Sequence, residues 1–442
     1  MKIVFVSLGC DKNLVDTEMM LGLLREKGYS FTDDETEADI AVVNSCCFIG
    51  DAKEESIQTI LELAQLKESG QLKALVVTGC LAQRYASDIR SEIPEVDAVV
   101  GTMAIEDIVA AVEGAVAGKK PDFFRELSSA PARVKDRVLT TGGHYAYLKI
   151  AEGCDKHCTY CVIPKVRGPY RSVPMEELTE QAERLAEAGV KELILVAQET
   201  TLYGLDLYGE KSLHLLLRRL AQIPGIFWIR ILYCYPEEIT DELIEVIRTE
   251  PKICHYLDIP VQHASDPVLR RMGRRTDQAR LRSQIGKLRE RIPDICLRTT
   301  LISGFPGETQ EDFEELYRFV NEMEFDRLGV FAYSQEEDTP AADMQPQVPE
   351  EVKCSRRDEL MELQQAIAFE KAEEMIGRKL YVCVEGKVAE EDVYVTRTYK
   401  DAPGVDGFLF LRTSAALMTG DFVKVCVTDC NEYDLIGEIC ED

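Results

Sequence analysis

The chain has 442 residues, of which 45% are hydrophobic, and its formal net charge is -28 at pH 7. The length predicts two or three domains, and the apolar content excludes a wholly disordered chain. So acidic a surface disfavours binding to the phosphates of a nucleic acid and favours a basic partner, although the same charge can serve solubility alone.

The N-terminus and the later apolar stretches bear on cellular location. The first ten residues, MKIVFVSLGC, contain a short apolar run without the longer apolar region of a secretory signal. Later runs stay below the roughly 18 apolar residues of a membrane span. We therefore expect a soluble, cytoplasmic protein. Its 15 cysteines should then stay reduced and serve metal binding or catalysis rather than disulfide formation.

Residues 1–125 repeat one pattern three times. The runs KIVFVSLGC, ADIAVVNSCC and LKALVVTGC are apolar and β-branched, and each precedes a helix-like stretch, which predicts the buried strands of a parallel βα sheet. Parallel strands end at one edge, so Cys10, Cys46 and Cys80, hereafter the N-terminal cysteines, should converge in a metal site. Cys46 is preferred to Cys47 because neighbouring strand residues face opposite sides. For each cysteine alone, an inert buried thiol is the alternative.

A linker and a second βα region follow. In residues 126–140, Pro, Ser and Gly replace the apolar periodicity, which indicates a linker. Over residues 141–350, six apolar segments, from AYLKIAEG to DRLGVFAYS, alternate with amphipathic helical stretches. This alternation predicts an α/β fold with a partial (βα)6 barrel of the TIM type, whose functional groups lie on loops at the C-terminal strand ends.

The motif EGCDKHCTYC follows the first of these segments and places Cys154, Cys158 and Cys161, hereafter the barrel cysteines, at CxxxCxxC spacing. A cubane iron-sulfur cluster normally takes four cysteines, but the next one, Cys234, lies on a different predicted strand. Three thiolates leave one iron open for S-adenosylmethionine (SAM), whose reductive cleavage releases a radical. A similar cluster on the N-terminal cysteines would carry a sulfur atom for donation. A zinc site that includes His157 is the less favoured alternative.

Four residues are candidates for the SAM pocket. Tyr160 lies between two barrel cysteines, Gln198 ends a predicted barrel strand, and Arg298 offers a charge for the cofactor carboxylate. Gly304, together with Gly307 in SGFPGE, would allow a close backbone approach to a ligand. Loop packing is the alternative for Tyr160, and pairing with a structural acid is the alternative for Arg298.

Beyond residue 350 the pattern changes twice. Residues 351–375 are rich in Glu, Leu, Ala and Gln and predict a helix that connects two domains. Residues 376–442 contain five short alternating segments separated by turns, which predicts a small all-β barrel of the OB type. This segment has 7 Lys and Arg against 13 Asp and Glu, a net charge of -6. Its Cys426 and Cys430 have no third partner at ligand spacing and are expected to be ordinary thiols.

Eight stretches carry a family resemblance over nearly the whole chain: SLGCDKNLVDTE, VVNSCCFIGDAKEES, VTGCLAQRY, EGCDKHCTYCVIPKVRG, LILVAQETTLYGLDLYG, YLDIPVQHASDPVLRRMGRR, LRTTLISGFPGET and TRTYKDAPGVDG. Together they resemble the radical SAM methylthiotransferases, and within that family the RimO branch, which modifies an aspartate β-carbon in the small-subunit ribosomal protein uS12. The tRNA-modifying branch usually has GCQMN where this chain has GCDKN. One departure is Cys47, where the RimO pattern commonly has Gly, and this leaves Cys46 as the matching ligand.

The resemblance implies three domains and their cofactors. A methylthiotransferase domain would hold an auxiliary 4Fe-4S cluster on the N-terminal cysteines, and a radical SAM barrel would hold a second 4Fe-4S cluster on the barrel cysteines. A C-terminal TRAM domain would recognise the substrate. SAM is implied twice, as methyl donor and as radical source. The implied partners are uS12, free or within the small subunit, an electron-donating reductase and a sulfur source, with no membrane.

Two alternatives stay open at the level of sequence. In the first alternative, the same methylthio transfer acts on an isopentenyladenosine of tRNA. A TRAM domain that binds tRNA should be basic, however, and this one is acidic. The second is a non-catalytic iron-sulfur or zinc protein that docks on the ribosome and does not cleave SAM. The sequence therefore predicts a uS12 methylthiotransferase, with a tRNA methylthiotransferase as the main alternative.

Overall fold

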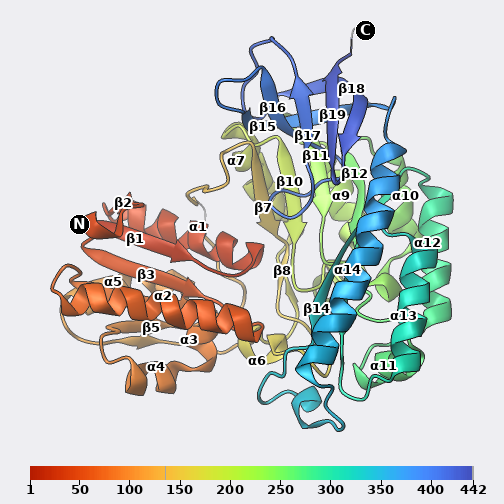
Figure 1. The fold of residues 1–442 in the computed structure, drawn as a ribbon. Helices are drawn as coiled ribbons and strands as arrows, with labels where there is room; N and C mark the ends of the chain where they lie inside the picture. Colours follow the sequence, from red (N-terminus) through yellow and green to blue (C-terminus); the bar gives the residue numbers. More distant parts are fainter. Residues whose placement is uncertain (135, 441–442) are drawn as a thin grey trace.

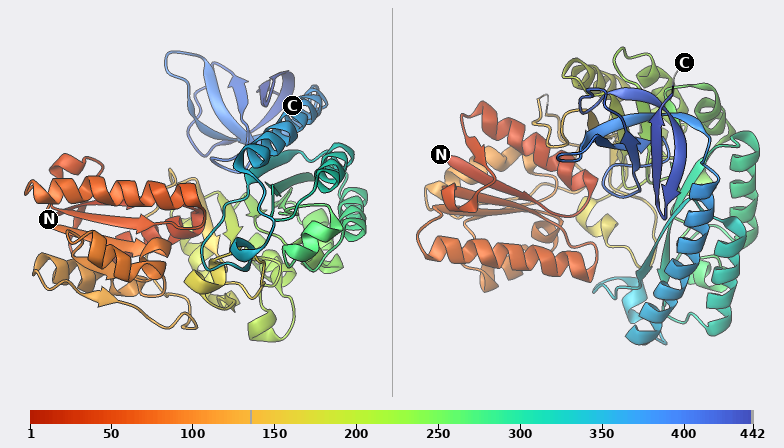
Figure 2. Two further views of the ribbon diagram at one scale, coloured as in Figure 1. Left: turned by 60° about the horizontal axis from the view of Figure 1, so that its bottom comes forward. Right: turned by 45° about the horizontal axis from the view of Figure 1, so that its top comes forward.

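The computed structural model describes residues 1–134 and 136–440 and divides into three parts (Figure 1). Residue 135 of the expected linker and residues 441–442 of the expected C-terminal barrel lie outside the described residues. A parallel α/β domain lies beside a larger βα barrel, and a small β-barrel covers one end of the larger one (Figures 1 and 2). Within the described part of the chain, no helix is both long and apolar enough to span a membrane.

The N-terminal domain is built on a six-stranded parallel sheet. Its strands are β1 (Lys2–Ser7), β2 (Ser30–Thr32), β3 (Ile40–Ser45), β4 (Ala74–Gly79), β5 (Ala98–Val100) and β6 (Asp122–Phe123). Its helices are α1 (Asp11–Glu26), α2 (Gly50–Glu68), α3 (Cys80–Arg84), α4 (Ala86–Glu92) and α5 (Ile108–Val116), with 3-10 turns η1 (Glu35–Glu37) and η2 (Ile105–Asp107). The strand order is β2-β1-β3-β4-β5-β6. The three runs that end in cysteine form β1, β3 and β4, and the structure adds the shorter β2, β5 and β6.

Helices cover both faces of this sheet, which explains why its central strands are apolar throughout. On one face, α1 and α5 pack through residues such as Met20 and Ile108. On the other face, α2, α3 and α4 pack through Ile60, Leu81 and Ile89. Because β1, β3 and β4 are neighbours in parallel register, their C-terminal ends bring the three cysteine-bearing loops together at the edge that faces the barrel (Figure 1).

The central domain is a partial barrel of six parallel strands, as expected. These are β7 (Tyr145–Lys149), β10 (Glu192–Val196), β11 (Trp228–Ile231), β12 (Ile253–Asp258), β13 (Cys296–Ser303) and β14 (Arg327–Ala332). They pair in chain order, and among the described residues β14 and β7 do not pair, so the barrel stays open between them. The expected AYLKIAEG strand divides in two, because β8 (Ala151–Glu152) leaves the barrel and pairs with β9 (Arg171–Ser172).

Helices connect these strands and cover the outside of the barrel. They are α6 (Ile163–Arg167), α7 (Met175–Glu187), α8 (Leu205–Tyr208), α9 (Leu213–Ala221), α10 (Asp241–Thr249), α11 (Asp266–Arg271), α12 (Gln278–Arg291) and α13 (Gln310–Met323), with 3-10 turns η3 (Pro236–Glu238) and η4 (Pro340–Asp343). The amphipathic stretches MEELTEQAERLAEAG and EDFEELYRFVNEM form α7 and α13, whose Leu178 and Phe319 enter the core. A capping box between Thr309 and Asp312 begins α13.

The C-terminal region consists of one long helix and a closed barrel. Helix α14 (Glu350–Glu373) packs along β14 and α13 and leads into the barrel (Figure 1). The barrel strands are β15 (Lys379–Lys387), β16 (Val393–Thr398), β17 (Leu409–Arg412), β18 (Phe422–Asn431) and β19 (Asp434–Ile439), in the order β15-β16-β17-β19-β18. The five alternating segments of the sequence are these five strands, so the expected small all-β barrel is confirmed.

The C-terminal barrel covers the N-terminal ends of the central strands. Glu192, the first residue of β10, pairs with Arg230 of β11 and with Arg397 of β16, at 2.8 Å in each case. All three side chains are at most 1% exposed. At the start of β14, Arg327 pairs with Asp401 at 2.6 Å. The C-terminal barrel therefore does not cover the opposite ends of the central strands, where the functional loops lie.

Candidate active site

The barrel cysteines lie on a loop that follows β8, and two other loops hold it in place. The amide of Cys154 donates to the carbonyl of Gly168 at 3.1 Å, and the amide of Thr159 donates to the carbonyl of Met272 at 2.9 Å. These bonds tie the two halves of the loop to the segments after α6 and α11. The loop is therefore shaped by tertiary contacts, since it contains no helix or strand.

Gly153 and Gln198 set the direction in which the cysteine loop starts. Gly153 has a φ of +80°, and a Cβ there would lie 2.1 Å from the carbonyl oxygen of Pro169. Its amide donates to Oε1 of Gln198 at 2.9 Å, and Nε2 of Gln198 donates to Glu152 at 2.9 Å. Gln198 thus lies at the C-terminal end of β10 as expected, but in this structure its amide group is occupied by the loop.

Among the barrel thiols, Cys154 and Cys158 are buried and Cys161 is partly buried, and polar groups that suit sulfur ligands lie beside them. The hydroxyl of Tyr235 lies 3.2 Å from Sγ of Cys158, and the amide of Lys156 donates to Sγ of Cys154 at 3.4 Å. Burial raises the pKa of Cys154 and of Cys161 to about 12. The thiolate forms need a positive centre to become stable here, and metal binding would release their protons.

Tyr160 and Arg274 adjoin this loop. The ring of Tyr160 meets that of Phe305 edge to face, with centroids 6.4 Å apart. The guanidinium of Arg274 lies 4.1 Å from the ring centroid of Tyr235. It is 5% exposed, and its Nε and one terminal nitrogen have no hydrogen-bond partner among the described residues. Nothing in the sequence RRMGRR distinguishes Arg274 from the neighbouring arginines, so only the folded structure identifies it.

The N-terminal cysteines meet at the sheet edge that faces the barrel. Cys10 precedes α1 as its N-cap, Cys46 follows β3, and Cys80 is the first residue of α3. Sγ of Cys46 lies 2.9 Å from the position that a Cβ on Gly9 would take, so it faces the loop of Cys10. Burial, with Cys80 and Cys10 as neighbours, raises the pKa of Cys46 to about 12. The second thiol of the pair, Cys47, packs in the apolar core under α2.

Asn13 gathers the three cysteine-bearing loops. Its Nδ2 donates to the carbonyl of Leu8 at 3.0 Å and to the carbonyl of Ser45 at 3.1 Å, which are the residues that lead to Cys10 and Cys46. Its Oδ1 lies 3.8 Å from Sγ of Cys80. One amide therefore contacts all three loops. The only signal in the sequence was its place in GCDKN, and a polar residue on α1 is more often solvated.

The start of α1 also reaches the interior of the barrel. The hydroxyl of Tyr233, just after β11, donates to Asp11 at 3.0 Å, and the ammonium of Lys12 lies 3.2 Å from the ring centroid of Tyr233. Tyr233 has a φ of +60°, which is rare for a bulky residue and typical of functional sites. The residues that follow Cys10 thus pack against the loop at the C-terminal end of β11.

A cavity of about 220 Å³ is lined by residues that neighbour both sets of cysteines in sequence. Phe48 and Ile49, which follow Cys46 and Cys47, contribute to one wall. Tyr160 contributes to another, and the remaining residues of the lining come from β13, β14 and nearby loops: Gln262, Thr300, Ile302, Phe331, Ala332, Tyr333, Ser334 and Glu336. A substrate in this cavity would contact the segment that follows Cys46 and the loop of the barrel cysteines.

The other proposed pocket residues have different surroundings. Arg298 pairs with Asp258 at 3.3 Å and with Asp406 of the C-terminal barrel at 3.5 Å. This is the alternative given above for Arg298, in which it pairs with structural acids. Gly304 and Gly307 have φ values of +68° and +77°. A Cβ on Gly304 would meet the side chain of Lys353 at 2.2 Å, and one on Gly307 would meet that of Arg271. The close approach predicted for these glycines is thus made by protein side chains.

The donor sets fit iron-sulfur clusters better than single ions. Each set consists of three cysteines, and none of the 15 cysteines, all of which are described, forms a disulfide. Among the described residues, neither set nor His157 belongs to a group whose ligand atoms lie within 4.8 Å of one another. A single zinc ion needs such close ligands, whereas a cubane holds its thiolates farther apart because each binds a different iron.

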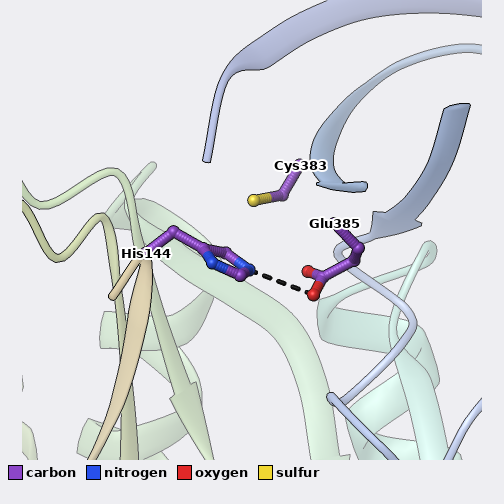
Figure 3. Close-up of side chains that lie close together, drawn as sticks. All are labelled: His144, Cys383 and Glu385. Atoms are coloured by element: carbon purple, nitrogen blue, oxygen red, sulfur yellow. Dashed lines mark hydrogen bonds and ion pairs between the residues drawn. The ribbon is translucent and has the colours of Figure 1, made fainter. Parts of the chain in front are cut away.

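One compact group of possible ligands lies elsewhere, where β15 meets the start of β7. His144, Cys383 and Glu385 converge there, and Nε2 of His144 lies 3.0 Å from Glu385 (Figure 3). The other oxygen of Glu385 accepts from Arg397 at 2.7 Å. Because the guanidinium of Arg397 already balances the charge of Glu385, we interpret the group as a polar contact that joins the central and C-terminal barrels. We do not interpret it as a cation site.

Family models match successive parts of the chain. Residues 2–101 match a family described as uncharacterized protein family UPF0004, residues 148–320 match the radical SAM superfamily, and residues 376–440 match the TRAM domain. The three matches follow the three structural parts. The first covers the N-terminal cysteines, and the second covers the barrel cysteines.

Relatives match the chain over its whole length. It is 62% identical over 437 residues to the ribosomal protein uS12 methylthiotransferase RimO of Lachnoclostridium phytofermentans, with 99% of each chain covered. It is 52% identical over 442 residues to the protein of the same name from Pelotomaculum thermopropionicum, again with 99% of each covered. The identity to that of Clostridioides difficile is 48% over 439 residues, with the same coverage.

Solved structures share the fold at low sequence identity. The radical SAM methyltransferase TsrM of Kitasatospora setae has a TM-score of 0.54 and 15% identity, covering 85% of this chain and 78% of TsrM. The cobalamin-dependent radical SAM enzyme OxsB has a TM-score of 0.52 and 13% identity, covering 83% of this chain and 56% of OxsB. At such identities the likeness concerns the fold alone.

Proposed function

Because the chain belongs to the ribosomal protein uS12 methylthiotransferase RimO family, we propose that it transfers a methylthio group to the β-carbon of an aspartate in uS12. The family is that of radical SAM enzymes, which use SAM and a 4Fe-4S cluster. The observation that supports this reaction best is a cavity whose lining includes Phe48 and Ile49, which follow Cys46, and Tyr160 of the barrel cysteine loop. Such a cavity suits a substrate carbon that must meet both a radical and a sulfur donor.

We propose two 4Fe-4S clusters, one on the N-terminal cysteines and one on the barrel cysteines. When bound, these groups and SAM supply a 5'-deoxyadenosyl radical that removes a hydrogen atom from the substrate, and a methylated sulfur that replaces it. SAM would serve both as radical source and as methyl donor. The three-cysteine sets support this proposal, since each would leave one iron of a cubane open.

The chain's own residues prepare both sites. Gln198 and Gly153 orient the loop of the barrel cysteines, and Asn13 holds the loops of the N-terminal cysteines together. Tyr160 reaches the cavity from the radical side, so we propose that it contacts SAM, with Gln198 as a residue that positions the loop. Apolar residues such as Ile302 in the cavity wall would keep water from reactive species.

The negative charge of the chain supports a basic protein as its partner. The whole chain carries -28 and residues 376–442 carry -6, with 7 Lys and Arg against 13 Asp and Glu, which suits a ribosomal protein rich in Lys and Arg better than the phosphates of tRNA. We further propose a reductase and a sulfur source as partners, and the cytoplasm as the place of action, because the substrate would be the free or assembled ribosomal protein.

Mass spectrometry of two candidate substrates tests the reaction. The reconstituted protein would be incubated anaerobically with SAM, a reductant and either uS12 or an isopentenyladenosine-containing tRNA. A methylthio group on an aspartate of uS12 alone is the expected result. Modification of the tRNA alone would overturn the assignment of substrate while leaving the cluster chemistry in place.

Cysteine variants separate the two proposed clusters. Replacement of the barrel cysteines by Ala should abolish formation of 5'-deoxyadenosine, because no cluster would then hold SAM. Replacement of the N-terminal cysteines by Ala should preserve this cleavage and stop sulfur transfer. Unchanged SAM cleavage in the first variant would contradict the assignment of the radical site.

A further inference from the structure

Arg167 joins the loop of the barrel cysteines to the site of the N-terminal cysteines. It is the last residue of α6, shortly after Cys161, and it is 1% exposed. Its guanidinium pairs with Asp16 of α1 at 2.7 Å and approaches Glu152 of β8 at 3.4 Å, and it also donates to Oδ1 of Asn13. A residue of the central domain thus ends inside the N-terminal domain.

The guanidinium of Arg167 is the cation beside Cys80. Burial raises the pKa of this thiol, and the charge of Arg167 opposes that effect. The two side chains also share one acceptor, because Oδ1 of Asn13 contacts both. Cys80 is 8% exposed, so water screens this interaction little.

Buried acids fix Arg167 in this position. Asp16 and Glu152 are each 2% exposed, and both also pair with Lys149 at the end of β7. Two cations and two anions therefore neutralise one another in a network that crosses between the domains. Such a network holds a guanidinium rigidly, since any displacement would leave a buried charge unpaired.

The same network continues to the barrel cysteines. Glu152 accepts from Gln198, which in turn accepts from the amide of Gly153, directly before Cys154. A continuous series of polar contacts thus runs from the barrel cysteine loop through Glu152, Arg167 and Asn13 to Cys80. The position of one set of cysteines relative to the other is fixed by these side chains.

We propose that Arg167 is a positioning residue for the auxiliary cluster: from across the domain boundary it acts on Cys80 through Asn13, and its charge raises the reduction potential of the cluster on the N-terminal cysteines. The inference rests on the proposed function, because it needs a cluster at these cysteines. A fixed cation near a ligand sulfur favours the more negative, reduced state of an iron-sulfur cluster. Loss of Arg167 should therefore make the auxiliary cluster harder to reduce.

The test is a redox titration of the auxiliary cluster alone. The full-length protein with Cys154→Ala, Cys158→Ala and Cys161→Ala would be reconstituted anaerobically and titrated, with the reduced cluster followed by electron paramagnetic resonance. Adding Arg167→Met should lower the ratio of reduced to oxidised cluster about tenfold at a fixed potential, which is about 59 mV for a one-electron couple. Arg167→Lys keeps the charge and should show a clearly smaller fall.

Two further variants make the comparison specific. Arg171→Met removes a partly buried arginine of the same segment, which donates to the carbonyls of Pro169 and Arg167 rather than to Asn13, and should leave the potential nearly unchanged. Glu152→Gln removes a negative charge beside the guanidinium and should raise the potential. It also provides a test of opposite sign if Arg167→Met does not fold, which circular dichroism would reveal.

The outcomes separate this inference from the function on which it rests. Equal potentials in the parent, the Arg167→Met variant and the Glu152→Gln variant, with normal iron content, would overturn the role of Arg167 and leave the two-cluster proposal intact. A parent protein that binds neither iron nor sulfide at the N-terminal cysteines would overturn the second cluster and the inference together. A fall in the Arg167→Met variant alone, with Arg171→Met unchanged, supports the inference.

Discussion

At the scale of single residues, the site depends on polar side chains as well as on the cysteines. Asn13 contacts the loops of all three N-terminal cysteines, and Gln198 holds the start of the barrel cysteine loop. Buried polar groups are costly unless they are paired, so each of these side chains has a fixed place. The ligands supply the chemistry, and these amides determine where the ligands lie.

Asn13→Ala should weaken the auxiliary cluster selectively. The loops that lead to Cys10 and Cys46 would each lose a hydrogen bond, and the carbonyls of Leu8 and Ser45 would lose a donor. After reconstitution we expect about half of the wild-type iron content, because only the barrel cluster would remain complete. Iron analysis checks this result. Asn431→Ala, an exposed change in β18, should keep the full content, and equal iron in both variants would contradict the role of Asn13.

Glu199 should make stability depend on pH. Its side chain is fully buried after β10, and burial raises its pKa from 4.5 to about 7, although it accepts hydrogen bonds from Thr201. The folded state therefore binds this proton more tightly than the unfolded state. The stability it provides is complete below pH 4.5 and is lost as the pH rises through 7, by about 3 kcal/mol.

Glu199→Gln should remove that loss of stability. Urea unfolding of the cluster-free protein at pH 5 and pH 8 should show a smaller pH dependence in the variant than in the wild type, because the amide carries no charge to bury. Glu180→Gln on the exposed face of α7 serves as the control and should follow the wild type. Identical pH dependence in the wild type and the Glu199 variant would show that Glu199 is not the group responsible.

At the scale of elements, the strands follow the sequence pattern and the functional loops do not. Apolar β-branched runs form β1, β3 and β4 because both faces of the sheet are covered. The loop of the barrel cysteines has no such pattern, and its path depends on contacts with Gly168 and Met272. A single backbone position, Gly153, connects this loop to β8.

Gly153→Ala should displace the barrel cysteine loop. A Cβ would lie 2.1 Å from the carbonyl oxygen of Pro169 and 2.5 Å from that of Gly168, and neither backbone atom can move freely. We expect SAM cleavage to fall by at least about tenfold, measured as 5'-deoxyadenosine, since small misplacements of reacting groups have large effects on rate. The auxiliary cluster should still assemble.

Gly189→Ala is the matched control for this change. Gly189 also has a positive φ, +101°, but no atom lies within 4 Å of a Cβ at this position. Both variants carry the strain of an unfavourable backbone conformation, about 1 kcal/mol. Only Gly153→Ala adds a steric clash at the loop. Equal loss of SAM cleavage in both variants would attribute the effect to backbone strain alone.

At the scale of the whole molecule, ionic contacts across the domain boundaries fix the arrangement of the three parts. The C-terminal barrel is anchored by Glu192 between Arg230 and Arg397, and the N-terminal domain is anchored by Asp16 with Arg167. The side chains of both contacts are almost completely buried between the domains. The acidic C-terminal barrel is thereby held at a fixed distance from the cavity.

Glu192→Gln should destabilise the docked C-terminal barrel strongly. The variant would leave Arg230 buried without a carboxylate partner, while Arg397 keeps Glu385, and an unpaired buried charge costs about 3–5 kcal/mol. Chemical unfolding would measure the loss, and limited proteolysis should cut earlier between α14 and β15. Glu176→Gln breaks an exposed pair with Arg219 and should leave the free energy of unfolding essentially unchanged. Equal stability of the two variants would contradict the anchoring role.

The sequence by itself determined the three-part α/β architecture, the strand ends that carry Cys10, Cys46 and Cys80, and the spacing of the barrel cysteines. These features depend on the periodicity of apolar residues and on the spacing of cysteines, and both can be read directly from the sequence. It also indicated the family through motifs, and full-length relatives show the same family. It did not reveal the short strands β2, β5 and β6, whose pairing depends on neighbours in the sheet.

Only the tertiary structure decided how the two sets of cysteines are joined. Asn13 and Arg167 are separated by 154 residues, yet they share a hydrogen bond beside Cys80. It also decided that Arg298 pairs with Asp258 and that Gly304 adjoins α14. The physical reason is that the charge state and partner of a buried polar group depend on the residues packed around it, and these come from distant parts of the chain.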